Sequence, residues 1–201
     1  MIQLSLKKTI GTFKLVAQMS DSGFIFLTGP NGSGKSTFLK LLAGVYRPDE
    51  GYVKLNGLDI TPLPIRKRGV VLVTPDSFFP HMEVEEHLKY GAKLRSLNLS
   101  QYEVVEIKKC LGIDFSGKVG RLSLGQIERV IMGTALLSRP RLLLIDEATA
   151  NVSGKADFLV CVKRFSSDQG MDLILVSQDP SESIYADKRY VMNNGTLMKI
   201  E

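Results

Sequence analysis

The stretch that determines the fold is FIFLTGPNGSGKST, residues 24–37. Its first five residues are an unbroken apolar run closed by Thr28, as expected for a strand buried on both faces. Residues 29–36 then fit the pattern GxxxxGK[ST] with no mismatch. A helix is expected from Ser36 to Ala43, ended by Gly44 and Pro48. A buried strand, a glycine-rich loop and a helix in this order predict a phosphate-binding loop (P-loop) rather than a plain surface turn.

Each residue type in this loop has a physical reason to be there. Glycines let backbone N–H groups close around a phosphate without a Cβ in the way. Lys35 supplies a positive charge for the β- and γ-phosphates, and the Ser36 hydroxyl is expected to ligate Mg²⁺. The first turn of the helix favours an anion. The residues expected to bind Mg-ATP here are Gly29, Asn31, Gly32, Ser33, Gly34, Lys35, Ser36 and Thr37.

A second motif is the apolar run of residues 142–145, which ends in Asp146 and Glu147. In an open α/β sheet, ligands bind beyond the carboxyl ends of the strands. Asp146 is therefore expected to hold Mg²⁺, and Glu147 to orient or deprotonate the attacking water. The alternative is a pair of solvated acids at a strand end, which the accompanying P-loop disfavours.

A third motif, LSLGQ at residues 122–126, allows two interpretations together. Ser123 and Gln126 have the spacing of a capping box that opens a helix reaching Leu137. A helix N-terminus is also an anion site, so the same residues can contact a nucleotide.

The rest of the chain alternates strands and helices, which predicts an α/β fold: a P-loop nucleotide-binding domain with a mostly parallel sheet. An antiparallel hairpin is expected at residues 2–7 and 12–19, and further strands near 52–55, 70–73, 173–176 and 190–200. A helix is expected near 156–165. We expect one domain over residues 1–201, with a helical lobe at 83–122 inserted in the P-loop core.

Composition narrows the functional classes. A net charge of +5 with scattered basic residues does not favour nucleic acid as a partner. No apolar run is long enough to span a bilayer, so membrane association is expected through a partner. Cys110 and Cys161 lie far apart without CxxC spacing, and they are expected to be reduced and packed as small apolar residues in a cytosolic protein.

GPNGSGKST, LSLGQIERV and LLLIDEAT, in this order and spacing, resemble the ATP-binding subunits of ABC transporters over nearly the whole chain. The resemblance implies an ATPase that drives a membrane transporter. It implies two such subunits, alike or different, facing each other, with Ser123, Gly125 and Gln126 of one contacting the ATP of the other. It also implies a transmembrane partner and a place on the inner face of the cell membrane. The segment from residues 55–61 through 79–82 resembles the corresponding segment of importers of the oxyanion and sugar classes.

Four positions depart from the family pattern. Leu124 replaces a signature glycine, and Thr74 or Pro75 stands where a Mg²⁺-sensing glutamine is usual. Ser153 takes the place of an aspartate at the dimer contact. Gln178 replaces the histidine that contacts the γ-phosphate, and we expect it to serve that catalytic position. These departures keep open a slow or inactive regulatory subunit paired with a more complete ATPase.

Other side chains have two interpretations each. Phe13 can stack on adenine or pack in the hairpin. Phe78, Phe79 and Met82 can line the groove for the membrane subunit or pin the lobe to the sheet. His81 and His87 are expected on a solvated or transporter-facing surface. A soluble ABC-type ATPase without a transport role and a P-loop kinase are the remaining functional alternatives; the kinase does not explain LSLGQ.

Overall fold

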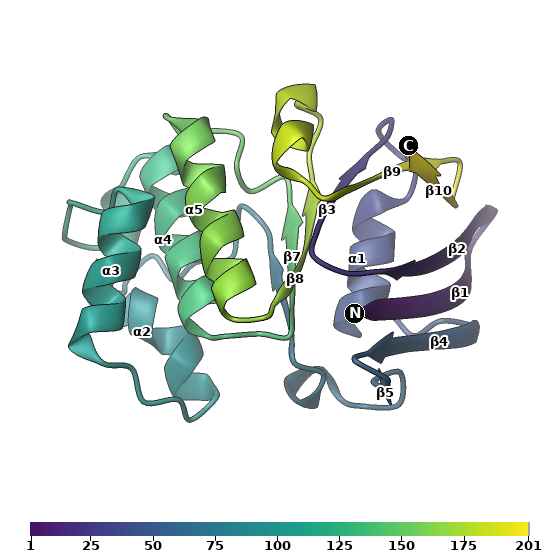
Figure 1. Cartoon of the computed structure of the whole chain (residues 1–201), viewed down its shortest axis with the longest axis horizontal. Coiled ribbons are helices and arrows are strands. Elements are labelled where there is room, and N and C mark those ends of the chain that lie inside the picture. The colour runs from purple at the N-terminus through teal and green to yellow at the C-terminus, as the bar shows by residue number, and fades with distance from the viewer. Residues whose placement is uncertain (201) are drawn as a thin grey trace. The chain divides into compact units, whose positions relative to one another are not determined.

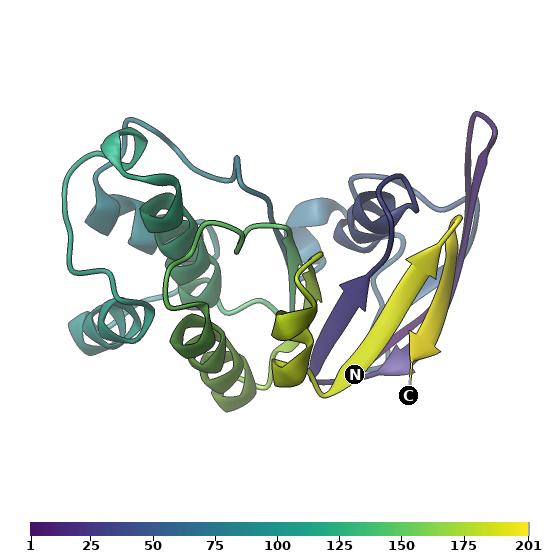
Figure 2. The same cartoon turned by 90° about the horizontal axis from the view of Figure 1, so that it is seen from above.

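A computed structural model describes residues 1–200, and their strands form one mixed sheet (Figure 1, Figure 2). The strand order is β5-β4-β1-β2-β10-β9-β3-β8-β7-β6. The strands are β1 (Ile2–Ile10), β2 (Phe13–Asp21), β3 (Phe24–Thr28), β4 (Glu50–Leu55), β5 (Leu58–Asp59), β6 (Val70–Val73), β7 (Leu142–Asp146), β8 (Asp172–Val176), β9 (Lys188–Asn193) and β10 (Thr196–Ile200).

The sheet combines an antiparallel part with a parallel part, as predicted. β1 pairs antiparallel with β2 and β4, whereas β3 pairs parallel with β8 and β9, and β8 pairs parallel with β7. The predicted P-loop α/β class is therefore confirmed. The chain divides into two compact units. Unit 1 comprises Met1–Leu72, Arg141–Asp146 and Met171–Glu201, and unit 2 comprises Val73–Pro140 and Glu147–Gly170.

Unit 1 holds the sheet, helix α1 (Lys35–Ala43), and the 3-10 turns η1 (Ile65–Lys67) and η3 (Pro180–Tyr185). α1 buries an apolar face into the same core that the hairpin and the central strands share; its fully buried members include Phe38, Leu39, Leu41 and Leu42. The buried parallel strands read as continuous apolar runs because both of their faces are covered.

The C-terminal end of α1 is fixed by one buried guanidinium. Arg68, 2% exposed, donates to the carbonyls of Leu41 and Leu42 at 3.3 Å each. It also donates to the carbonyls of Thr61 and Leu63 at 2.7 and 2.9 Å. Carbonyls at a helix end have no partner inside the helix, so a cation there is stabilising. Burial lowers the pKa of Arg68, and the neighbouring Arg47 lowers it further, while Asp59 opposes the shift.

Unit 2 is helical: α2 (Val84–Leu94), α3 (Gln101–Leu111), α4 (Leu124–Leu137), α5 (Lys155–Asp168) and the 3-10 turn η2 (Val119–Arg121). α2 crosses α4 closely because α4 carries a glycine at the crossing: a Cβ on Gly133 would come within 2.6 Å of Leu88. The predicted lobe boundaries of 83–122 fall inside this unit, which also includes α4 and α5; the boundaries themselves stay a prediction.

Two sequence-based expectations about unit 2 are wrong. His87 is not on a surface: it is 2% exposed, and its Nδ1 lies 2.8 Å from the Thr134 hydroxyl. Residue 87 falls on the face of α2 that packs on α4. The position of a residue in the helical period determines which face it occupies, whereas its residue type alone does not. Cys110 and Cys161 are joined by a disulfide, because α3 and α5 bring residues 51 positions apart side by side.

Candidate functional site

The P-loop follows β3 in unit 1 and opens helix α1. Gly34 is the N-cap of α1 with φ 106°, a conformation that strains any residue with a side chain. A Cβ at Gly34 would lie 2.6 Å from the Phe13 ring, and a Cβ at Gly29 would lie 2.1 Å from the Met192 carbonyl oxygen. Glycines are therefore needed at these two positions, because the neighbouring backbone and ring leave no room for a Cβ, as the motif predicted.

Lys35 lies within this loop rather than in solvent. It is 6% exposed, and its Nζ donates to the carbonyls of Gly29 and Pro30 at 2.7 and 3.0 Å. A buried ammonium ion held only by carbonyl dipoles is suited to an anionic ligand, which offers it full negative charges. Ser33 adds a buried hydroxyl whose Oγ has no hydrogen-bond partner within the described residues. The loop therefore fits a phosphate group.

Phe13 packs on the loop itself. Its ring contacts Gly34 and is packed against the core of unit 1. Phe13 therefore packs in the hairpin beside the P-loop, and stacking of its ring on adenine stays a prediction.

The carboxyl ends of β3, β7 and β8 meet at one edge of the sheet. Leu27 is in register with Val176, and Val176 with Asp146, so the P-loop, Asp146 and the residues after β8 are neighbours. Across this edge Gln178 donates from Nε2 to Asn31 Oδ1 at 2.7 Å. The predicted P-loop, Asp146 and Gln178 are therefore brought together within unit 1.

Glu147 follows β7 directly and belongs to unit 2. It is exposed and has φ 55°, in the left-handed region that residues other than glycine seldom adopt. Such backbone strain costs on the order of 1–3 kcal/mol and is concentrated at functional sites. The backbone conformation singles Glu147 out, and its catalytic role stays a prediction.

The LSLGQ segment, also in unit 2, opens α4 through the predicted capping box. Ser123 Oγ accepts from the Gln126 backbone N–H at 3.3 Å, and Gln126 Oε1 accepts from the Ser123 N–H at 3.0 Å. Leu124, which departs from the family pattern, is 65% exposed at this helix start. The segment therefore presents a helix N-terminus and an apolar side chain outward.

The segment after Glu147 packs tightly on this helix. A Cβ on Gly125 would lie 2.4 Å from the Asn151 carbonyl oxygen, so a glycine is required there. Glu128, 3% exposed, accepts from the Asn151 backbone N–H at 2.9 Å and from its side-chain Nδ2 at 2.8 Å. The Glu128 carboxylate therefore binds both the backbone and the side chain of Asn151, which fixes the orientation of that residue.

Arg129 makes a second connection. Its guanidinium donates to the carbonyls of Leu111 and Ser153, and it lies 5.8 Å from the centre of the Phe158 ring. Sequence reasoning missed Glu128, Asn151 and Arg129. The available signal for Glu128 and Arg129 was a pair of adjacent charges, the only charged residues in a helix that is mostly apolar; the sequence offers no such signal for Asn151.

The family model described as "ABC transporter" matches residues 14–150. The molybdate/tungstate import ATP-binding protein WtpC of Archaeoglobus fulgidus is 36% identical over 98% of this chain and 85% of that protein. The protein of the same name from Pyrococcus abyssi is 37% identical over 88% of this chain and 54% of its own length. The spermidine/putrescine import ATP-binding protein PotA of Protochlamydia amoebophila is 35% identical over 88% of this chain and 50% of its own length.

Solved structures agree with this result. An ATP-binding subunit of an ABC transporter superposes with a TM-score of 0.84 at 21% identity, over 99% of this chain and 89% of that one. A nucleotide-free cassette of an ABC transporter gives 0.78 at 27% identity, over 98% and 90%.

The chain belongs to the ABC transporter family, and it is an ATP-binding subunit of that family of ATPases. The predicted class is therefore confirmed. The chain spans most of one curated relative and about half of the others named above.

Proposed function

We propose that this chain binds and hydrolyses Mg-ATP to drive import through a transmembrane partner at the inner face of the cell membrane. The observation that carries the proposal is the sheet edge of unit 1, where buried Lys35 and glycines with positive φ form a phosphate cradle beside Asp146. The relatives named as import proteins support the direction of transport. Their names give different substrates, molybdate or tungstate for one and spermidine or putrescine for the other, so no substrate is proposed for this chain.

The residues divide into roles. Lys35 and the loop N–H groups would hold the β- and γ-phosphates. Gln178, whose amide donates to Asn31 of the loop, would donate a hydrogen bond to the γ-phosphate. Ser36 and Asp146 would hold Mg²⁺, which would neutralise phosphate charge. Glu147 orients the attacking water or accepts its proton. Mg²⁺ prefers oxygen ligands. The exposed Ser36 hydroxyl in the first turn of α1 and the Asp146 carboxylate at the end of β7 both supply them.

A second ATP-binding subunit, alike or different, completes the site in this proposal. Ser123, Gly125 and Gln126 of one subunit would contact the nucleotide of the other. Leu124, which is exposed in the single chain, would be buried between the two subunits. In unit 2, the contacts of Glu128 and Arg129 keep residues 151–153 in place beside this segment. The described residues thus present an ordered surface where the second subunit would bind.

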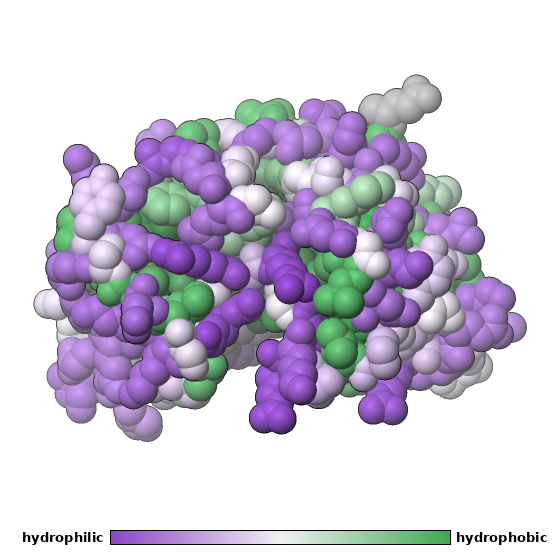
Figure 3. All heavy atoms as spheres, turned by 60° about the horizontal axis from the view of Figure 1, so that its bottom comes forward, coloured by the Kyte–Doolittle hydropathy of each residue, from purple (hydrophilic) through white to green (hydrophobic). Residues whose placement is uncertain are grey.

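The partner in the membrane would dock on unit 2. Phe79 is 46% exposed, and it stacks edge-on against Tyr90 at 4.9 Å. On the face drawn in Figure 3, hydrophobic side chains form small groups between hydrophilic ones. No helix in residues 1–200 is long and apolar enough to cross a membrane. Because Phe79 is exposed and Phe78 and Met82 are only partly buried, these three apolar side chains are proposed as a local docking surface.

Sedimentation of the Glu147→Gln variant tests the ATPase proposal. Removing the carboxylate should stop hydrolysis and leave a longer-lived dimer with Mg-ATP than the wild type gives. A variant that binds ATP but stays monomeric at saturation would rule out the homodimer and leave a mixed pair. A variant that hydrolyses ATP at the wild-type rate would remove Glu147 from the mechanism.

A slower, regulatory role is the second candidate, favoured by Gln178. An amide donates a hydrogen bond but cannot gain positive charge near neutral pH, as a histidine can. Losing a charged contact to a transferring phosphoryl group typically costs a few kcal/mol, so turnover about a hundredfold slower is expected in the isolated chain. Rapid steady-state hydrolysis by the wild type alone would exclude this candidate.

A further inference from the structure

The disulfide in unit 2 is not part of the nucleotide site, and its two sulfurs differ in access. Cys110 and Cys161 have Cα atoms 5.8 Å apart, within the usual span of a bridge. Cys161, on α5, is 3% exposed among apolar side chains, whereas Cys110, near the end of α3, is half-buried. Only one sulfur of the pair is therefore open to a reagent.

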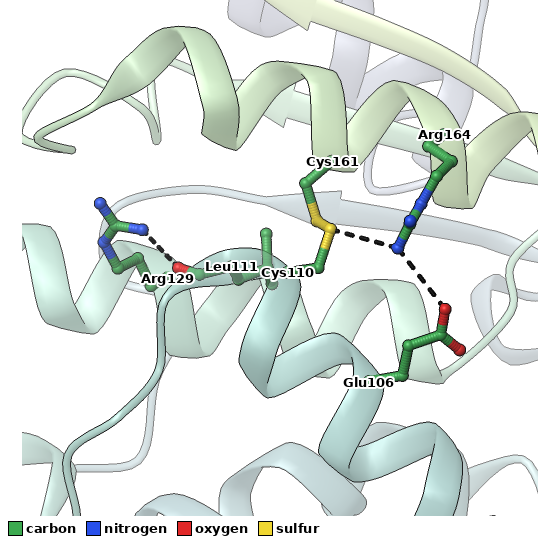
Figure 4. The surroundings of a disulfide bond; sticks show 6 residues. All are labelled: Glu106, Cys110, Leu111, Arg129, Cys161 and Arg164. Atoms are coloured by element: carbon green, nitrogen blue, oxygen red, sulfur yellow. Dashed lines mark hydrogen bonds and ion pairs between the residues drawn. A yellow bond between two sulfur atoms is a disulfide. The ribbon is translucent and has the colours of Figure 1, made fainter.

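Cys110 faces a hollow on the surface of about 520 Å³, lined by Tyr102, Val105, Glu106, Lys109, Cys110 and Arg164. Figure 4 shows the Arg164 guanidinium between this sulfur and Glu106. Arg164 Nη2 lies 3.4 Å from Cys110 Sγ and 3.5 Å from a Glu106 carboxylate oxygen. A guanidinium beside a sulfur stabilises the thiolate formed when a disulfide opens, and Glu106 partly offsets that effect.

The bridge joins the two elements that Arg129 holds. Arg129 is on α4, six residues after the signature serine Ser123. One of its carbonyl partners is Leu111, the residue after Cys110, and the other is Ser153, two residues before α5, which carries Cys161. Loosening α3 from α5 therefore loosens both acceptors of Arg129.

We propose that Cys110 and Cys161 form a thiol–disulfide exchange site whose redox state sets the rigidity of residues 122–129 and 149–154. The co-reactant is a dithiol. One of its thiolates attacks Cys110 Sγ, the Cys110–Cys161 bond breaks, and Cys161 leaves with the electron pair and takes up a proton. The second thiolate then attacks the mixed disulfide, releasing Cys110 as the thiolate beside Arg164. The dithiol is oxidised to a disulfide, and the protein disulfide is reduced by two electrons.

Burial makes this site selective for dithiols over monothiols. After a monothiol attacks Cys110, the Cys161 sulfur is still packed against it and re-forms the original bond. A dithiol escapes this reversal because its second thiol reacts within the same molecule at a high effective concentration. The consequence for the signature segment rests on the proposed function, since that segment is the surface for the second subunit.

The chemical test compares dithiothreitol with 2-mercaptoethanol at equal thiol concentration on the folded wild-type chain. After quenching in acid, unfolding in denaturant and alkylation with iodoacetamide, so that buried Cys161 is reached as well, intact-mass measurement should find both cysteines modified only in the dithiothreitol sample. The rate of reduction should be at least tenfold lower with the monothiol. Modification of both cysteines without any reductant, or equal rates for the two reagents, would overturn the proposed exchange site.

Amide hydrogen exchange then tests the coupling, on oxidised and reduced wild-type chains without nucleotide. Residues 122–129 and 149–154 should exchange severalfold faster after reduction, whereas P-loop residues 29–36 should not change. A Cys110→Ser/Cys161→Ser double variant should exchange like the reduced chain under both conditions. Exchange that does not respond to reduction overturns the coupling.

Titration with Mg-ATP separates this outcome from a failure of the proposed function. Reduction should leave the ATP affinity of the single chain unchanged. A chain that binds Mg-ATP but shows no redox-dependent exchange refutes only the inference drawn here from the disulfide. A chain that binds no Mg-ATP in either redox state refutes the proposed function.

Discussion

The P-loop and the LSLGQ segment both present a helix N-terminus, but they are held in different ways. The P-loop of unit 1 depends on glycine backbone geometry and on one lysine bonded to loop carbonyls. The LSLGQ segment of unit 2 depends on side chains of the same helix, with Glu128 holding Asn151 and Arg129 holding Ser153. A motif built from backbone has few acceptable sequences, whereas a surface supported by side chains tolerates exchanges. All four departures from the family pattern lie outside the P-loop, and two of them, Leu124 and Ser153, belong to or contact the LSLGQ helix.

Ser153 illustrates this tolerance. The family's aspartate is absent at this position, yet the residue still offers its carbonyl to Arg129. Arg129 also donates to the Ser153 hydroxyl at 3.4 Å, but the carbonyl contact does not depend on which side chain stands at this position.

The largest effect is expected at the P-loop. Lys35→Ala should weaken ATP binding by at least about a hundredfold, because the ammonium group would make two charge-assisted contacts, to the β- and γ-phosphates, of about 1.5 kcal/mol each. The folding stability should change less, since the contacts of Lys35 are to its own loop. Calorimetric titration of Mg-ATP measures the loss, and Lys40→Ala on the same helix is the matched control. Equal affinity in the two variants would refute the phosphate-binding role.

The reverse pattern is expected in unit 2. Glu128→Ala should lower the free energy of unfolding by about 1.5–3 kcal/mol, because the backbone N–H and the amide of Asn151 lose a buried, charged acceptor. ATP affinity of the single chain should stay within about twofold. Urea unfolding measures the change, and Glu128→Gln, which keeps a carbonyl acceptor, should lose less. If stability is unchanged while ATP affinity falls, the contrast between the two regions does not hold.

A smaller effect is expected at Gln178, which lies beside the P-loop in unit 1 and is proposed to contact the γ-phosphate. Gln178→His should raise turnover about tenfold, equivalent to about 1.4 kcal/mol of barrier, by restoring a group able to carry positive charge. ATP affinity should change little. Steady-state hydrolysis of wild type and variant measures this, with Glu147→Gln subtracted as background. A slower variant would show that the Gln178–Asn31 hydrogen bond matters more than the missing charge.

The smallest effect is a pH dependence confined to unit 2. Burial lowers the pKa of His87 from its usual 6.5, although its own backbone opposes the shift. As the pH falls through about 6.5, the unfolded chain binds this proton before the folded chain does, so stability present above that pH is lost. The slope is at most about 1.4 kcal/mol per pH unit.

The slope is measured as the free energy of unfolding of the wild type and of His87→Asn between pH 8 and pH 5. These two pH values lie about 1.5 units on either side of 6.5. Asparagine can keep a donor toward Thr134 but does not titrate near neutral pH. The variant should lose the slope. The same slope in both proteins would assign it to other groups.

The sequence by itself determined the class of this protein. Glycines and a lysine at fixed spacing, after a strand buried on both faces, leave few other structures, because backbone conformation and the next neighbours in the chain are local properties. The capping box of Ser123 and Gln126 was predictable for the same reason, since both partners lie within one helical turn.

Only the tertiary structure decided which distant residues meet. His87 is buried because α2 crosses α4, and Cys110 meets Cys161 because α3 lies beside α5. The pairing of Glu128 with Asn151 and of Gln178 with Asn31 likewise joins segments far apart in the chain. Such contacts depend on how helices and strands pack, and the spacing of residues in one sequence carries no record of that packing.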